Sequence, residues 1–252
     1  MLIAIDKPKW ISSFDIIRAL RRELWEKKIG HSWTVEPMAT GLLLIWTWKD
    51  TKQLHNLTWL DKTYITNIDF SKMSDTRDMD YREYFEEFDI AKLTKPSIEQ
   101  IISTLDSIIP NWELPLPPFS AKKKNGKKLY ELARKWEQII ENKNMIIYWY
   151  KILDYQFPNL KLELKVWSGT YIRSIWYRLG QELSVWWILT ELRRTQIWDY
   201  KLETINMDKK GTFFIKNRWE DWEKKWQDQW KIEFNYWIIQ NDNIDDSLNG
   251  NK

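Results

Sequence analysis

The sequence predicts a protein of the α+β class, on three observations. Residues 160–166 alternate strictly between apolar and charged side chains, which is typical of a half-buried strand. Residues 12–24 and 94–105 instead carry apolar side chains at helical spacing. Strands and helices also follow one another without the regular strand–helix–strand repetition of a parallel α/β protein, and this mixture indicates α+β.

Four elements are expected in the first seventy residues. They are a short strand over 2–5, a helix over 12–24, a buried strand over 42–45 and a strand over 62–70. Ser12 and Ser13 both offer an N-cap for the helix. Asp15, three residues after Ser12, gives the spacing of a capping box. An acidic loop over 74–80 is expected after the fourth element.

The second half of the chain is expected to hold more helix. Thr94 and Pro96 open one helix, residues 111–118 are proline-rich and not helical, residues 128–138 form a helix, and a turn over 168–170 leads into a helix through Leu183. The tail after residue 200 is too irregular for us to expect a second folded domain, and 241–252 are expected to be disordered.

Composition excludes several kinds of chemistry. The 252 residues suffice for one large domain, or for one domain and a small appendage. Cysteine is absent, which excludes thiol catalysis, disulfides and cysteine-bound zinc, and the presence of only two histidines disfavours a histidine metal site. Without a signal peptide or a membrane-length apolar run, we expect a cytoplasmic protein. The net charge of +3 supports nucleic-acid binding only if it is clustered.

The most informative segment is Gly30-His31-Ser32-Trp33-Thr34-Val35-Glu36-Pro37-Met38-Ala39-Thr40-Gly41-Leu42. It resembles the active-site segment of TruB-type tRNA pseudouridine synthases, whose pattern is roughly G-H-x-G-T-L-D-P-x-A-T-G-x-L. Further blocks resemble the family in the same order, namely Asp6-Lys7-Pro8, Lys62-Thr63-Tyr64, Pro117-Pro118-Phe119-Ser120-Ala121-Lys122, Ser168-Gly169-Thr170-Tyr171-Ile172-Arg173-Ser174 and Leu192-Arg193-Arg194-Thr195. Together they cover about residues 3 to 200.

The resemblance implies a fold and a reaction. The implied fold is the pseudouridine synthase fold, a mixed, mainly antiparallel sheet flanked by helices, with a catalytic domain over 1–200, an RNA-clasping insertion over about 110–150, and a short, partly flexible extension over 201–252 without a confident PUA domain. The implied reaction converts a uridine of the tRNA T-stem-loop to pseudouridine, without cofactor or metal. We expect a monomer with tRNA as its partner.

The resemblance places three residues in catalysis. Glu36 stands where the family has its catalytic aspartate, Arg173 resembles the arginine that pairs with that carboxylate, and Tyr64 resembles the tyrosine that stacks on the flipped base. Glutamate keeps the charge but moves it by more than about 1 Å, an error that can cost on the order of 100-fold in rate. The alternatives are a structural loop glutamate bound to Arg173 and a tyrosine that fills the core.

Six further residues are predicted to bind the RNA. His31, Tyr171 and Leu192 resemble a base-extruding histidine, a residue beside the catalytic arginine and an apolar wall of the base pocket. Lys122, Lys124 and Lys127 belong to the densest basic cluster, which we expect to contact phosphates. Each has a plain structural alternative, such as a loop histidine, a core leucine or a solvated lysine run. Asp75, Asp78 and Asp80 lack calcium-loop spacing and resemble a metal-free family loop.

Two other functional readings remain. Because Glu36 replaces the family aspartate, the protein could be an RNA-binding or tRNA-folding module that has lost catalysis. The related guide-RNA-dependent synthases are a third reading, which requires protein partners that the sequence does not identify.

Tryptophan is strangely frequent. Nineteen tryptophans stand against seven glycines, where average usage would give roughly 18 glycines. Several fall where the family pattern has glycine: Trp10, Trp33, Trp48, Trp136, Trp198 and the pair Trp186-Trp187. Glycine occurs at such sites because a positive φ or a close backbone approach excludes a Cβ. We therefore hypothesise that a codon read here as tryptophan, UGA being the obvious candidate, is read as glycine in the source organism. The alternative is a naturally tryptophan-rich protein. Trp219, Trp222, Trp226 and Trp230 lie at helical spacing and predict an amphipathic helix as written, or, if they are glycines, a polar flexible loop, which we favour.

Overall fold

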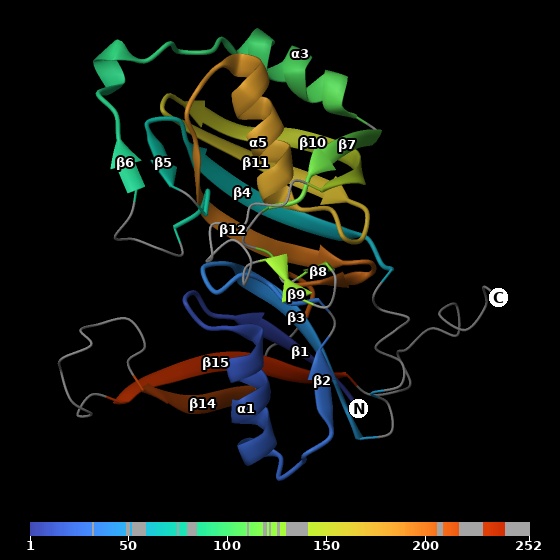
Figure 1. The fold of residues 1–252 in the computed structure, drawn as a ribbon. Coiled ribbons are helices and arrows are strands. Elements are labelled where there is room, and N and C mark those ends of the chain that lie inside the picture. Colours follow the sequence, from blue (N-terminus) through green and yellow to red (C-terminus); the bar gives the residue numbers. More distant parts are fainter. Residues whose placement is uncertain are drawn as a thin grey trace. The chain divides into compact units, whose positions relative to one another are not determined.

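The computed structural model describes most of the chain. It leaves out residues 32, 49–50, 52–58, 75, 80–84, 110, 118–119, 121, 125–126, 130–140, 206–208, 217–228 and 240–252, and it describes only the backbone of 85, 111, 123–124, 127–128, 212–216 and 229–232. The chain forms two compact units, one of Met1–Thr58 with Thr195–Lys252 and one of Trp59–Arg194 (Figure 1).

The first unit is an antiparallel sheet with one helix. Its elements are β1 (Leu2–Lys7), α1 (Ser13–Glu23), β2 (Ile29–His31), β3 (Thr40–Thr47), β13 (Tyr200–Lys201), β14 (Lys209–Lys216) and β15 (Gln229–Ile239). The strand order is β14-β15-β1-β3, and β2 pairs with β3. Strands β1 and β3 are almost entirely buried, and α1 turns Ile16, Ile17 and Leu20 into the core.

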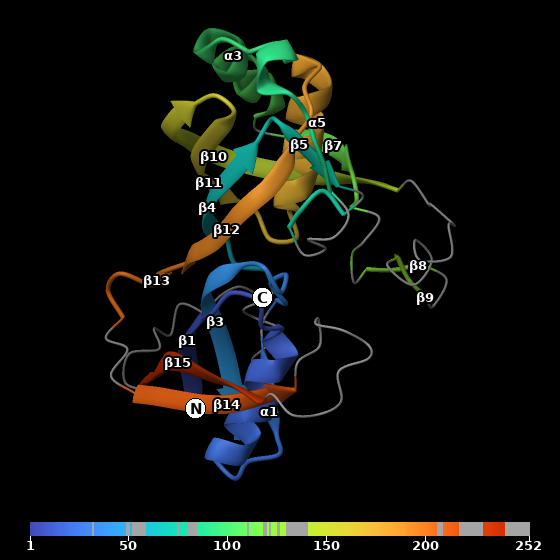
Figure 2. The same ribbon diagram turned by 90° about the vertical axis from the view of Figure 1, so that its left-hand side faces the viewer.

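The second unit has a larger antiparallel sheet. Its elements are β4 (Lys62–Asp69), β5 (Lys72–Ser74), β6 (Phe85–Glu87), the 3₁₀ turn η2 (Ile90–Lys92), α3 (Ile98–Ile108), β7 (Asn111–Pro115), β8 (Lys123–Lys124), β9 (Lys127–Lys128), β10 (Asn142–Gln156), β11 (Asn159–Val166), α5 (Ile172–Leu183) and β12 (Ile188–Ile197), whose last three residues belong to the first unit. The order is β12-β4-β11-β10-β7. Helix α5 lies on one face of this sheet, with α3 beside it (Figures 1 and 2).

The predicted mixed, mainly antiparallel sheet flanked by helices is confirmed. The alternation over 160–166 is strand β11, in which Leu160, Leu162 and Leu164 are buried. The capping box at Ser12 is confirmed: its Oγ accepts the Asp15 N–H at 3.1 Å, and its own N–H donates to Asp15 Oδ2 at 3.2 Å.

Some boundaries differ from the expectation. Helix α3 begins at Ile98 and not at Thr94, because Ser97 and Gln100 form the capping box that ends the preceding coil. Lys128 is the last residue of strand β9 and Leu129 is helical, so the helix expected from 128 begins one residue later; residues 130–138 lie outside the described residues.

The C-terminal segment contributes two long strands. Sequence patterns did not identify β14 and β15, which pair with each other and join the sheet at β1. Trp230 belongs to β15, so it lies in neither the helix nor the loop considered for this segment, while 217–228 are outside the described part. A domain boundary near residue 200 stays a prediction.

Among the described residues, no helix is long and apolar enough to cross a membrane. The same part of the chain holds no cluster of three or more side chains suited to a metal ion.

Candidate active site

The loop that carries Glu36 is fastened to strand β1 by a buried lysine. Lys7, the last residue of β1, is 0% exposed. Its Nζ donates to the carbonyl oxygens of Pro8, Ile11 and Pro37 at 3.0, 2.6 and 3.2 Å. Pro37 directly follows Glu36, so the buried ammonium fixes the backbone on one side of the predicted catalytic carboxylate.

Helix α1 fixes the other side of the same loop. The Val35 N–H donates to the Oγ of Ser13 at 3.1 Å, and this hydroxyl also lies 3.4 Å from the Val35 carbonyl oxygen. The Ala39 N–H closes a turn onto the Glu36 carbonyl at 3.0 Å. Glu36 is itself half-buried, so the side chain has access to solvent on a backbone held at both ends.

His31 lies near Glu36 in the sequence and in the same unit. It ends β2, where it pairs with Ile45 of β3, and its Nε2 lies 3.1 Å from Thr34 Oγ1. The side chain is half-exposed. A half-exposed imidazole agrees with the predicted RNA-binding role, which stays a prediction.

The other predicted catalytic residues belong to the second unit. Arg173 is the second residue of α5 and is 5% exposed. Its Nη1 lies 2.9 Å from Asp78 Oδ2 and donates to the Thr76 carbonyl at 3.0 Å. The carboxylate of Asp78 is also buried. The arginine thus has a buried carboxylate partner from the acidic loop, whereas the pairing with Glu36 stays a prediction.

Asp78 is the residue that sequence reasoning placed without giving it a role. It was recognised as part of a family-like loop, but nothing in the sequence shows that it faces an arginine 95 positions later. Backbone contacts fix it in place: Asp78 forms a parallel bridge with Leu189 of β12, and its carbonyl accepts from Ser74 Oγ at 2.9 Å and Thr76 Oγ1 at 3.3 Å. Asp75 and Asp80 lie outside the described residues.

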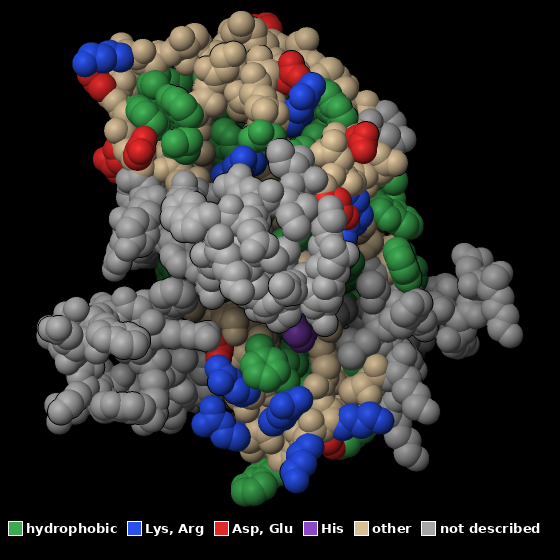
Figure 3. Space-filling model, viewed as in Figure 1, with side chains coloured by type: hydrophobic (Ala, Val, Ile, Leu, Met, Phe, Trp, Pro, Cys, Tyr) green, Lys and Arg blue, Asp and Glu red, His purple; other side chains and the backbone are tan. Residues whose placement is uncertain are grey.

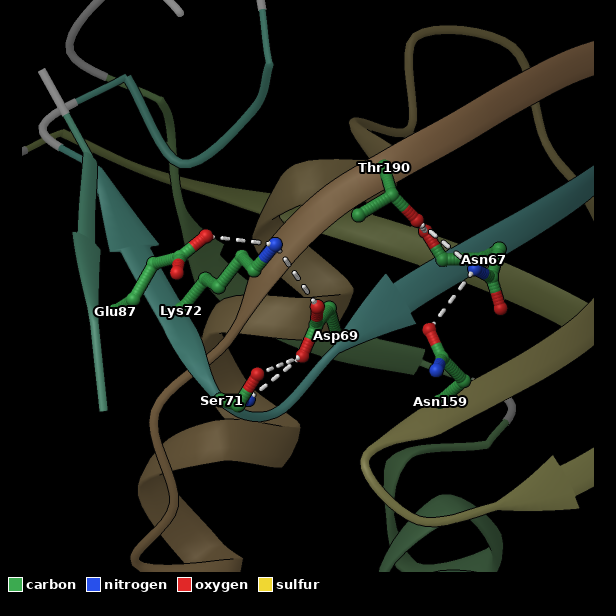
Figure 4. A network of polar contacts seen from close by, with 7 residues as sticks. All are labelled: Asn67, Asp69, Ser71, Lys72, Glu87, Asn159 and Thr190. Atoms are coloured by element: carbon green, nitrogen blue, oxygen red, sulfur yellow. Dashed lines mark hydrogen bonds and ion pairs between the residues drawn. The ribbon is translucent and has the colours of Figure 1, made fainter. Parts of the chain in front are cut away.

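A polar network anchors the corner from which this loop departs (Figure 4). Asp69 Oδ1 accepts the N–H and the Oγ–H of Ser71 at 2.8 and 2.6 Å, which closes the turn between β4 and β5. Lys72 lies 3.0 Å from Glu87 and 3.8 Å from Asp69. The hydrogen bond to Glu87 is the main reason that the pKa of Lys72 is raised.

The same network joins three strands of the sheet. Asn67 of β4 donates to Thr190 Oγ1 of β12 at 2.9 Å and lies 3.5 Å from Asn159 Oδ1 of β11 (Figure 4). Thr190 Oγ1 in turn donates to the Asn67 carbonyl at 3.1 Å. Strand β12, to which Asp78 is bridged at Leu189, is therefore tied to β4 through the next residue, Thr190.

The remaining aromatic and apolar candidates differ in burial. Tyr64 pairs with Leu164 across β4 and β11 and is half-buried, so the choice between a stacking ring and a core tyrosine stays a prediction. Tyr171 is the N-cap residue of α5 and is half-exposed. Leu192 is 4% exposed, as a core leucine would also be.

Lys62, two residues before Tyr64, has a buried side-chain amine. Its Nζ donates to the Leu60 carbonyl and to Ser168 Oγ, the latter at 3.1 Å. Burial, aided by the charge of Arg194, lowers the pKa of Lys62 from 10.5 to about 7. Between these two values the unfolded chain binds a proton that the folded chain does not.

We therefore expect the stability to rise with pH between about 7 and 10.5 through this residue. Urea unfolding across that range should show a shallower rise in the Lys62→Met variant than in the parent. Lys201→Met, on the exposed surface of β13, is the control and should keep the parent's slope. Equal slopes for parent and Lys62→Met would contradict the assignment.

The predicted lysine cluster is partly described. Lys122 forms an ion pair with Glu141, so it is not merely a solvated lysine. Lys124 and Lys127 pair with each other in the β8–β9 hairpin, but their side chains lie outside the described part of the structure. Their role in phosphate binding stays a prediction.

A second basic surface surrounds helix α1 (Figure 3). Its exposed cations are Lys9, Arg18, Arg21, Arg22, Lys27 and Lys28. Phe14 is 54% exposed between two of them, with the guanidinium carbons of Arg18 and Arg21 5.5 and 6.0 Å from its ring centre. Sequence analysis missed this surface because a net charge of +3 does not reveal where cations gather.

Comparison with known proteins identifies the family. The model for the N-terminal domain of TruB family pseudouridylate synthases matches residues 21–172. tRNA pseudouridine synthase B of Fusobacterium nucleatum is 38% identical over 203 residues, which are 80% of this chain and 69% of that protein. tRNA pseudouridine synthase B of Chloroherpeton thalassium is 34% identical over 206 residues, 79% of this chain and 84% of that protein.

Solved structures agree on the fold. A crystal structure of a Cbf5–Nop10–Gar1 complex contains a chain that superposes with a TM-score of 0.61 at 21% identity. The match covers 79% of this chain and 49% of that one, so the chain spans about half the length of this structural relative. From the matched domain and the two enzymes above, the chain belongs to the TruB family of pseudouridylate synthases.

Proposed function

We propose that this protein converts a uridine in the T-stem-loop of tRNA to pseudouridine. The relatives that match over four fifths of the chain are tRNA pseudouridine synthases. The observation that carries the proposal is the carboxylate at position 36, on a loop that Lys7 and Ser13 hold from both sides. We further propose that the enzyme acts in the cytoplasm as a monomer without cofactor.

The proposed chemistry assigns a role to each catalytic residue. Glu36 supplies the carboxylate that attacks or stabilises the electron-poor carbon while the glycosidic bond breaks and the base rejoins through carbon. Tyr64 offers a half-exposed ring on which a flipped pyrimidine stacks. Arg173 supplies a cation whose position is set by Asp78.

RNA binding has support from charge and aromatic side chains. The cations around α1 and the lysines of the β8–β9 hairpin suit a phosphate backbone, and an exposed phenylalanine beside arginines is a common stacking platform for bases. His31, Tyr171 and Leu192 are proposed to contact the flipped nucleotide.

The test is pseudouridine formation in a T-stem-loop RNA. The parent chain should convert the loop uridine, and Glu36→Ala should abolish product while RNA affinity changes little. Glu23→Ala, an exposed acid on α1, is the matched control and should retain activity. If the protein binds the RNA but no form of it makes pseudouridine, the proposed synthase activity is refuted. The alternative is then supported, an RNA-binding module that has lost catalysis because Glu36 replaces the family aspartate.

A further inference from the structure

Tryptophan occupies the backbone conformations that glycine normally takes. Seven described residues other than glycine have φ in the left-handed region, and five of them are tryptophan: Trp10 (68°), Trp25 (50°), Trp33 (55°), Trp48 (54°) and Trp198 (50°). With 19 tryptophans in 252 residues, chance would place fewer than one there. Bulky side chains at positive φ are genuine outliers.

Trp25 shows the pattern at a helix end. Helix α1 ends with Leu24 as its C-cap, whose N–H bonds to the Leu20 carbonyl at 2.9 Å. Trp25 then takes the left-handed C′ position, which is usually glycine. Its side chain is 95% exposed, so no packing of the indole accounts for its presence. Comparison with the family pattern did not single out this residue.

Trp198 shows the same pattern in a hairpin. Ile197 of β12 pairs with Tyr200 of β13, which leaves Trp198 and Asp199 as a two-residue turn. Of these two, only Trp198 has positive φ. A two-residue hairpin with positive φ at its first central position alone is a type II′ turn, and glycine is its standard residue there.

The other three also belong to the first unit, and two of them lie close in the sequence to residues of the proposed active site. Trp10 stands in the turn just before Ile11, whose carbonyl accepts from Lys7, and Trp33 lies three residues before Glu36. Trp48 follows β3, with its N–H bonded to the Lys28 carbonyl at 2.9 Å. All three were expected from the sequence to replace glycine, as was Trp198. Trp186 and Trp187 are not at positive φ, and Trp136 is outside the described residues.

A buried tryptophan, Trp46, also suggests a replaced glycine, but because of an unsatisfied hydrogen-bond donor and not because of its backbone conformation. Trp46, in the middle of β3, is 1% exposed, and its indole N–H has no hydrogen-bond partner in the described structure. A buried tryptophan normally finds a partner for this group. A residue without a side chain would leave no such unsatisfied donor.

We infer that positions 10, 25, 33, 48 and 198 are glycine in the protein that its organism makes, and that one codon has been read as tryptophan in the printed chain. The active-site loop would then have a glycine three residues before Glu36. Without the indole, RNA could approach the backbone of this loop closely, as glycine permits.

Mass spectrometry of the protein isolated from its organism tests the inference directly. Peptides that span the five positions should contain glycine at each. Tryptophan at these positions would overturn it. This measurement needs no activity, so its outcome is separate from that of the proposed function.

Stability of the recombinant chain is a second, independent test. Replacing the five tryptophans by glycine together should raise Tm by roughly 10–20 °C, because each left-handed residue other than glycine is strained. The matched control replaces Trp112, Trp149, Trp167, Trp237 and Trp59, none of which has positive φ or stands at a family glycine, and should not raise Tm. No rise in the first variant would contradict the inference.

An independent observation concerns Arg77, next to the buried pair of Asp78 and Arg173. The guanidinium carbon of Arg77 lies 3.7 Å from the ring centre of Tyr177. Tyr177 is four residues after Arg173, one turn further along α5. Two consecutive loop residues therefore hold two residues on one face of the same helix.

The backbone at Arg77 is fixed as well. Its φ is 61°, its N–H donates to the Ser74 carbonyl at 3.0 Å, and its carbonyl accepts from the Leu189 N–H at 3.1 Å. A non-glycine residue held in this region is strained, and such strain gathers at functional sites. The Tyr177 hydroxyl is in turn bonded to Gln181 at 2.9 Å.

We propose that Arg77 is a positioning residue, whose stacking on Tyr177 holds Asp78 against Arg173. This proposal rests on the proposed function. Arg77→Ala should lower kcat about tenfold and leave KM for RNA unchanged. Tyr177→Ala should do the same, the double variant should lose no more than either single one, and Tyr177→Phe, which keeps a ring, should retain activity.

The control comes from the same helix. Arg178 stacks on Trp112 at 4.4 Å and pairs with Glu182, and neither contact involves Asp78, so Arg178→Ala should retain kcat. If the parent is active, two results would overturn the positioning role. The first is a double variant whose loss of kcat equals the combined losses of Arg77→Ala and Tyr177→Ala, and the second is an Arg77→Ala variant as active as Arg178→Ala. An inactive parent would count against the proposed function instead. In that case, hydrogen exchange of the Arg77 and Leu189 amides should still be faster in Arg77→Ala, and unchanged exchange would overturn the positioning role.

Discussion

Asp78→Asn should cost about 3–5 kcal/mol of stability and remove nearly all pseudouridine formation. The two side chains are 1% and 6% exposed, and their charges are 2.9 Å apart. Neutralising one member leaves the other as a buried, uncompensated charge, which is far more costly than losing a surface pair. The guanidinium would also lose the ion pair that holds it in place for the role proposed above.

Urea denaturation measures the loss of stability in Asp78→Asn, and pseudouridine formation measures its loss of activity. Asp154→Asn, on the exposed side of β10, is the matched control and should change stability by less than about 0.5 kcal/mol. Removing both charges, in Arg173→Met with Asp78→Leu, should restore much of the stability but none of the activity. A stable and fully active Asp78→Asn variant would contradict the assigned pair.

Glu36→Asp should raise the turnover number on the order of 100-fold. Aspartate withdraws the carboxylate by one methylene to the length used by the family, while Lys7 and Ser13 keep the backbone at positions 35 and 37 where it is. The backbone cannot easily retreat to compensate for the longer glutamate, because it is bonded on both sides.

Single-turnover kinetics with a T-stem-loop RNA would measure this gain. Glu23→Asp, the same shortening at the exposed end of α1, is the control and should leave the rate unchanged. A rate that falls in Glu36→Asp would mean that the loop is fitted to glutamate, and the expectation from the family pattern would be wrong for this chain.

Local patterns predicted the elements that local forces determine. The capping box at Ser12 and the alternation of β11 were confirmed because both depend on residues close in the sequence. The start of α3 was placed too early, because Thr94 and Pro96 resemble a helix start but Ser97 has the matching Gln100.

Long-range partners could not be predicted in the same way. The match of Asp78 to Arg173 depends on where β12 and α5 bring the acidic loop, and no spacing in the sequence encodes that contact. Strands β14 and β15 were missed because the tryptophans around 219–230 suggested a helix or, as glycines, a loop. Lys7 was noted only as part of a family block, because three carbonyls at one ammonium arise only after folding.

The place of β1 has a consequence for synthesis. This first strand of the chain lies between β3 and β15, the last described strand. During translation the outer edge of β1 stays open until residues 229–239 have left the ribosome. A product that stops before residue 229 would expose a buried apolar strand with unpaired amides, which is a template for aggregation.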